Sequence, residues 1–98
     1  MLGPDRSLKN IVGRRVKEAR GRFRPPLTQD QLSARLATLG VTVDRAAIAK
    51  IEGGGRRVAD FELKALARAL ALDIRWLLGL PDGKSRQEPH LSRPKGRA

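Results

Sequence analysis

The sequence predicts an all-α fold of five short helices around one aliphatic core. Apolar residues recur at helical spacing in five stretches, and helix start or stop residues flank these stretches. No stretch shows the sustained apolar–polar alternation of a strand. The 98 residues include only two Phe and one Trp, so aliphatic side chains must fill the core. We expect one domain over residues 7–80, between a flexible end at 1–6 and a disordered basic tail at 81–98.

The first helix is expected from Ser7 to about Gly21. Its inward face is formed by residues at helical spacing: Leu8, Val12, Val16 and Ala19, with Ile11 beside them. Pro25 and Pro26 exclude a helix in the segment that follows.

The second helix has a complete start signal. Thr28 is suited to the N-cap, and Gln31 three residues later completes a capping box. Leu27 and Leu32 flank this cap at the spacing of a hydrophobic staple. Gly40 marks the end of the helix, where a left-handed residue satisfies free carbonyl groups.

Three further helices are expected after this point. Asp44 caps the third, which turns Ile48 and Ile51 inward and ends at the glycines 53–55. The fourth begins near Asp60, and its buried face is Leu63, Leu66, Ala67 and Leu70. Asp73 caps a short fifth helix bearing Ile74, Leu77 and Leu78, which Gly79 and Pro81 stop.

Charge is unevenly distributed along the chain. Twenty-one Lys and Arg against ten Asp and Glu give a net charge of +11. Residues 1–26 carry eight basic and two acidic side chains, and residues 81–98 carry five and two, whereas residues 27–80 are nearly balanced. Such basic ends favour polyanionic partners, above all nucleic acid. Solubility alone would also explain them, and the basic tail is also consistent with an inert segment.

Composition argues against several other classes of protein. The chain has no Cys and a single His90, which leaves no basis for a disulfide, a thiolate site or a metal cage. No apolar run has the length of a membrane span, and Met1 to Asn10 lack the apolar core of a signal peptide. No catalytic set or nucleotide-binding loop is evident. We therefore expect a cytoplasmic protein that is not an enzyme and has no cofactor.

Four blocks, in this order, carry a family likeness: Thr28-Gln29-Asp30-Gln31-Leu32, Gly40-Val41, Ile48-Ala49-Lys50-Ile51-Glu52-Gly53-Gly54 and Leu63-Lys64-Ala65-Leu66-Ala67-Arg68-Ala69-Leu70. They resemble the lambda-repressor-like (Cro and Xre type) helix-turn-helix family, over roughly residues 10–80. The resemblance implies five helices, of which the second and third read DNA. It also implies a sequence-specific regulator of transcription that acts on double-stranded DNA in bacteria or phages, most often as a repressor in the bacterial cytoplasm, on the nucleoid.

The resemblance assigns roles to residues. Arg45, Ala46 and Lys50 match positions that face bases, while the backbone or groove edge is implied for Thr28, Gln29, Asp44, Ala47, Arg56 and Arg57. A helix-one arginine in this family pairs with the glutamate that Glu52 matches, and Arg20 occupies that position. Because Asp44, Arg45, Lys50 and Glu52 sum to zero charge, we expect the third helix to read bases rather than supply the main electrostatic attraction.

Other interpretations of these residues stay open. Arg45 and Lys50 also fit a solvated helix face, the glycines 53–55 a simple helix stop, and Trp76 either core or an interface. Arg22 and Arg24, in a linker longer than a minimal helix connection, either touch DNA or are solvated. The interval from Leu36 to Ile48 is also longer than in compact members of the family, which predicts an extended second helix or turn.

Partners follow from the same reasoning. A single domain of this type is expected to bind an inverted-repeat operator as a two-fold dimer, weak without DNA or formed on it. Contacts between copies are expected around the fifth helix, at Asp73, Trp76 and Leu80. One alternative is an antitoxin or accessory regulator whose main role is binding a partner protein. Another is a nonspecific nucleic-acid binder that relies on the basic ends.

Overall fold

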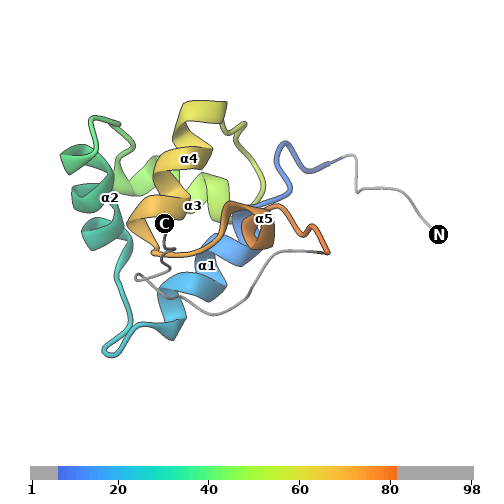
Figure 1. Cartoon of the computed structure of the whole chain (residues 1–98). Coiled ribbons are helices and arrows are strands. Elements are labelled where there is room, and N and C mark those ends of the chain that lie inside the picture. The colour runs from blue at the N-terminus through green and yellow to red at the C-terminus, as the bar shows by residue number, and fades with distance from the viewer. Residues whose placement is uncertain (1–6, 82–98) are drawn as a thin grey trace.

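A computed structural model describes residues 7–81, which form helices and no strand (Figure 1). The helices are α1 (Gly13–Arg22), α2 (Gln29–Thr38), α3 (Arg45–Glu52), α4 (Asp60–Ala69) and α5 (Ile74–Leu77). The predicted all-helical fold is therefore confirmed for these residues. The expected flexible end at 1–6, and all of the expected tail except Pro81, lie outside them. None of these helices is long and apolar enough to cross a membrane.

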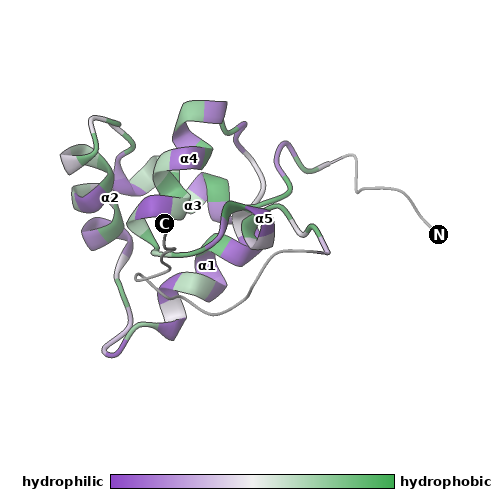
Figure 2. Ribbon diagram, viewed as in Figure 1, coloured by the Kyte–Doolittle hydropathy of each residue, from purple (hydrophilic) through white to green (hydrophobic). Residues whose placement is uncertain are grey.

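One aliphatic cluster occupies the centre of the helices. Helix α3 contacts α1 and α2, and α4 contacts α2 and α5 (Figure 1). The largest fully buried side chains come from all five helices and the residue after α4: Val16, Leu32, Leu36, Ile48, Ile51, Leu66, Leu70 and Leu77. Figure 2 shows hydrophobic and hydrophilic residues interspersed along each helix, as expected of helices buried on one face. Each such aliphatic side chain contributes about 1.5–3 kcal/mol by leaving water.

Helix α1 begins at Gly13 and not at Ser7, so the predicted first turns are wrong. Leu8 is 45% exposed and Ile11 is 61% exposed, although both had been expected to pack inward. The cause is Asn10, whose Oδ1 accepts hydrogen bonds from the N–H groups of Val12 and Gly13 at 2.9 and 2.7 Å. A side chain that caps these amides starts the helix here rather than further upstream.

Helix α2 begins and ends as predicted. Thr28 Oγ1 accepts from the backbone N–H of Gln31, and Gln31 Oε1 accepts from the backbone N–H of Thr28, which completes the capping box. Gly40 has a φ of +82°, and the Val41 N–H donates to the Leu36 carbonyl in a Schellman motif. The extra length after Leu36 therefore lies in the connection 39–44, since α2 ends at Thr38.

The later helices also begin where predicted. Asp44 Oδ1 accepts from the Ala47 N–H at 2.8 Å at the start of α3, and Asp73 Oδ1 accepts from the Arg75 N–H at 2.8 Å at the start of α5. Helix α3 ends in a second Schellman motif, in which Gly54 has a φ of +81°. Helix α4 is followed by Ala71 in the left-handed region at φ +55°, a conformation that usually requires glycine.

Candidate nucleic-acid interface

Helix α3 turns one face inward and leaves the other in solvent. Ile48 and Ile51 are 0% and 1% exposed and attach the helix to the core. The outer face carries Arg45, Ala46, Ala49 and Lys50, all exposed, while Ala47 is half-buried at its edge. The structure thus brings the three predicted base-reading residues onto one accessible face. Ala49 shares this face, which its spacing from Arg45 and Ala46 already indicated.

A polar network fixes α3 against α1 and α2. Arg20 of α1 donates to Glu52 from Nε at 2.6 Å and from Nη2 at 2.9 Å. The two side chains are 15% and 5% exposed, and the hydrogen bonds to Glu52 raise the pKa of Arg20. The predicted Arg20–Glu52 pair is therefore confirmed. Arg20 also donates from Nη1 to the Leu27 carbonyl, which ties the linker before α2 to the same network.

Gln29 belongs to this network as well. Its Nε2 donates to Glu52 Oε1 at 3.0 Å, so the side chain predicted to contact the DNA backbone also braces α3. Thr28, the other predicted contact at this helix end, is exposed, and its hydroxyl is used in the capping box. A contact between the start of α2 and a DNA phosphate therefore stays a prediction, because the first turn also carries the acidic Asp30.

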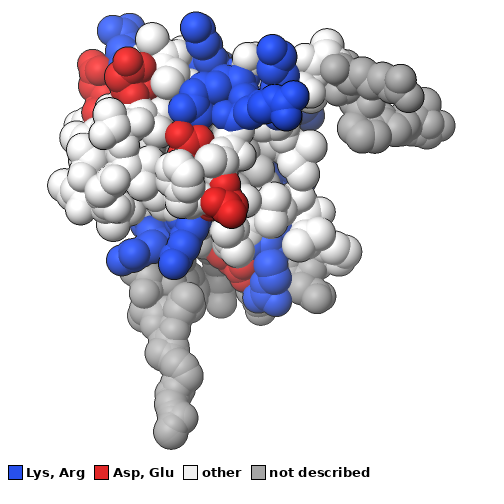
Figure 3. All heavy atoms as spheres, turned by 90° about the horizontal axis from the view of Figure 1, so that it is seen from above, with Lys and Arg blue, Asp and Glu red and all other residues white. Residues whose placement is uncertain are grey.

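The two predicted phosphate contacts in the loop after α3, Arg56 and Arg57, line the same hollow but differ in their partners. Arg56 Nη1 and Nη2 each lie 3.0 Å from an oxygen of Glu62, which is 8% exposed. This pairing raises the pKa of Arg56 and lowers the pKa of Glu62. Arg57 is exposed and lines an open hollow of about 540 Å³ together with Lys9. Figure 3, a view onto the end where α4 begins, shows Lys and Arg side chains gathered along one edge.

Asn10 connects the N-terminal segment to this loop, a role not expected from the sequence. Its Nδ2 donates to the carbonyls of Ile51 and Arg56 at 3.0 and 2.8 Å, in addition to the two bonds that Oδ1 accepts. The Lys9 N–H donates to the Gly54 carbonyl at 2.8 Å. Because Asn is a favoured cap residue, Asn10 before Val12 indicated a helix start at this point. The helical spacing of apolar residues from Leu8 onward favoured an earlier start instead.

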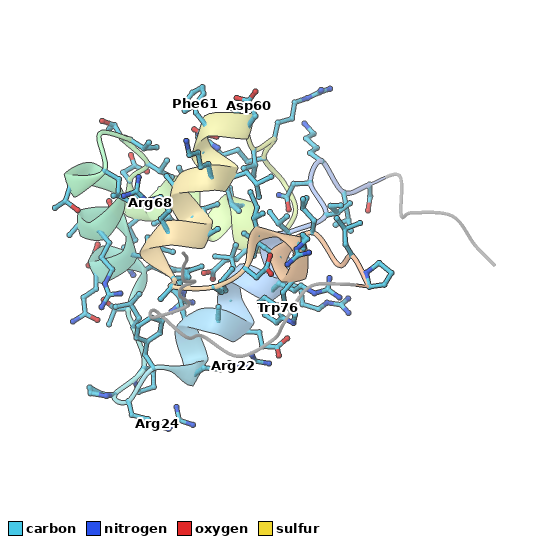
Figure 4. The ribbon with its side chains drawn as sticks, in the orientation of Figure 1. Arg22, Arg24, Asp60, Phe61, Arg68 and Trp76 are labelled. Carbon is cyan, nitrogen blue, oxygen red and sulfur yellow. The ribbon has the colours of Figure 1, made fainter. Side chains whose placement is uncertain are left out.

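Of the two arginines predicted in the linker, Arg22 is the last residue of α1 and Arg24 follows the helix, and both have partners within the chain. The Arg22 guanidinium lies 4.9 Å from the centroid of the Trp76 ring, and Arg22 also pairs with Glu18. Arg24 Nη1 donates to the carbonyls of Gly21 and Phe23, at the tip of the loop (Figure 4). A contact of either arginine with DNA remains a prediction. The structure also shows Arg35 stacked over Phe23 at 4.8 Å and bonded to the Ala69 carbonyl, which the sequence did not indicate.

The three residues predicted to join two copies have different environments. Asp73 caps α5 and pairs with Arg75, while Trp76 is half-buried and packs against the core. Leu80 is 49% exposed. Phe61, at the start of α4, is 62% exposed and points away from the helices (Figure 4).

No family model matches the chain, and no curated protein matches it. Within residues 7–81, no group of three or more His, Cys, Asp or Glu is placed to hold a metal ion. His90 lies outside the described residues.

Proposed function

We propose that this chain is a sequence-specific regulator of transcription that binds double-stranded DNA and acts as a repressor by occupying an operator. The exposed face of α3 is the observation that supports this function. It presents Arg45 and Lys50 on either side of Ala46 and Ala49. Arginine binds guanine O6 and N7 in the major groove, and alanines permit close approach and contact a thymine methyl. One bidentate pair is worth about 1–3 kcal/mol of discrimination.

The surroundings of α3 support the same function. Glu52, Arg20 and Gln29 hold α3 at a fixed angle to α1 and α2, as a helix that reads bases requires. Sequence-independent affinity would come from phosphate contacts at Arg57 and at the N-terminus of α2. The plot of log K against log salt concentration has a negative slope, and Arg57→Ala should make this slope less steep by about 0.9. The same change should weaken binding equally on all sequences.

We propose further that the operator is an inverted repeat bound by two copies, as a weak homodimer or as a dimer formed on DNA. Leu80 and Ile11 are exposed apolar residues suited to such a contact. Ile11 lines a groove of about 340 Å³ with Val58, Leu63 and Leu78. Gel filtration at micromolar concentration, with and without operator, tests the weak-dimer form. A tight dimer without DNA would contradict it.

Selection of binding sites from random duplexes, followed by deep sequencing, tests the function. A palindromic motif is the expected result. Arg45→Ala should then lose discrimination at one position of each half-site, whereas Arg68→Ala, which removes an equal charge from the exposed side of α4, should not. Enrichment of no motif would reject sequence-specific binding and favour a nonspecific binder driven by charge.

Exposed apolar side chains favour a second candidate, an antitoxin or accessory regulator that mainly binds a partner protein. Ile11, Phe61 and Leu80 are 61%, 62% and 49% exposed. If this candidate is correct, Phe61→Ser should abolish the regulatory effect in cells while DNA affinity stays unchanged. An unchanged effect in cells would speak against it.

A further inference from the structure

We propose that Arg56 is a positioning residue rather than a phosphate contact. Its pair with Glu62 holds the loop 53–57 so that Arg57 and Lys9 present their charges to one DNA phosphate. The inference rests on the proposed function, and it reverses the role that the family resemblance implies for Arg56.

The Arg56 guanidinium is already engaged within the chain. Nη1 donates to Glu62 Oε1 at 3.0 Å and to the Arg57 carbonyl at 2.9 Å, and Nη2 donates to Glu62 Oε2 at 3.0 Å. Glu62 Oε1 also accepts from the Ala59 N–H at 2.9 Å, at the start of α4. If Arg56 turned toward a phosphate, it would leave the buried Glu62 carboxylate without its cation, which is strongly unfavourable.

The rest of the loop is held from two other sides. Asn10 Nδ2 donates to the Arg56 carbonyl, and the Lys9 N–H donates to the Gly54 carbonyl, both at 2.8 Å. The Gly55 N–H donates to the Lys50 carbonyl, also at 2.8 Å, and so ties the loop to the end of α3. Arg57 is the cation of this loop whose side chain has no partner among residues 7–81. It lines the same hollow as Lys9, and the paired Arg56 and Glu62 form another part of the lining.

Glu62→Gln distinguishes a phosphate contact from a positioning role for Arg56, because the two roles predict opposite changes in DNA affinity. Glutamine still accepts from the Ala59 N–H, as in an ordinary capping box, so α4 keeps its start. If Arg56 contacts phosphate, removing Glu62 frees a cation and binding to the selected operator becomes tighter. If Arg56 positions the loop, binding becomes weaker, by roughly tenfold for the loss of one charge-assisted contact. Tighter binding would overturn the inference.

Matched variants exclude a general effect of charge or stability. Glu18→Gln makes the same charge change at an exposed pair on α1 and should not weaken binding. In an Arg57→Gln background, Glu62→Gln should have almost no further effect, because the contact it positions is already gone. Equal losses in both backgrounds would indicate general destabilisation and overturn the inference.

A charge swap tests the Arg56–Glu62 pair directly. The protein that carries both Arg56→Glu and Glu62→Arg should bind DNA more tightly than the Arg56→Glu protein. A double variant that folds but recovers no binding would contradict the positioning role.

Hydrogen exchange on the free protein distinguishes failure of this inference from failure of the proposed function. Glu62→Gln should speed exchange of the Gly55 amide at least severalfold, while the Ile48 amide in α3 stays protected. An unchanged Gly55 rate would reject the positioning role whether or not the chain binds DNA. A faster rate, in a protein that selects no duplex sequence, would instead reject the proposed function.

Discussion

Gly13 packs directly against the carbonyl oxygen of Ile51, where the start of α1 meets the end of α3. A Cβ placed on Gly13 would overlap this oxygen and would also lie 3.0 Å from the Glu52 carbonyl oxygen. Both obstacles are backbone atoms, so they cannot move away as a flexible side chain can. The glycine therefore sets how closely α1 approaches α3.

The first prediction compares two glycines of the same helix. Gly13→Ala should lower the free energy of unfolding by more than about 2 kcal/mol, since overpacking forces the backbone apart. Gly21→Ala, at a position with no atom within 4 Å of the new Cβ, should raise it by about 0.5 kcal/mol through helix propensity. Urea unfolding measures both. A change of the same sign at the two positions would contradict the packing argument.

The second prediction concerns the Arg20–Glu52 pair. Glu52→Gln should lower the free energy of unfolding by about 3 kcal/mol, because it leaves the largely buried Arg20 guanidinium without its charged partner. The exposed Arg22–Glu18 pair is the control, and Glu18→Gln should cost less than about 1 kcal/mol. Thermal melts measure both variants, and a Glu52→Gln protein as stable as the parent would refute the role given to this pair.

The third prediction is a dependence of stability on pH. The hydrogen bonds from Arg56 hold the pKa of Glu62 below its ordinary value, and so the pair stabilises the fold above that value. As the pH falls below about 4.3, the unfolded chain takes up a proton more readily than the folded chain, and this stabilisation is lost. The stability difference between the parent and Glu62→Gln should therefore be constant near neutral pH and shrink in acid. Urea unfolding as a function of pH checks it, and a constant difference down to about pH 2 would contradict the linkage.

The fourth prediction compares two helix ends. Ala71 adopts a left-handed conformation at φ +55° after α4, so Ala71→Gly should stabilise the protein by about 1 kcal/mol. Gly40 has a φ of +82° after α2, with no neighbouring atom within 4 Å of an added Cβ, and Gly40→Ala should cost about the same amount. Calorimetric melting measures both. A loss of stability in Ala71→Gly would show that the methyl group of Ala71 contributes more than the strain costs.

Local signals in the sequence were sufficient for four of the five helix starts. The capping residues Thr28, Asp44 and Asp73 hydrogen-bond the amides expected of them, because a cap acts only on the next two or three residues. The start of α1 was predicted too early because Leu8 continues the helical spacing of apolar residues. In the structure Asn10 caps the first amides of the helix, so the helix does not extend upstream to Leu8. The Arg20–Glu52 pair was available only through a family resemblance.

The sequence by itself determined the helical class, most helix boundaries and the residues on the exposed face of α3, since these depend on caps and on period. Only the tertiary structure decided how the loop after α3 is held. Asn10 bonds to Ile51 and Lys9 bonds to Gly54, and the members of each pair are far apart in sequence. No local pattern in the sequence predicts that these residues contact each other. For the same reason Arg56 and Arg57, adjacent and chemically identical, differ only in the folded chain: one lies against the buried Glu62 carboxylate, and the other faces solvent.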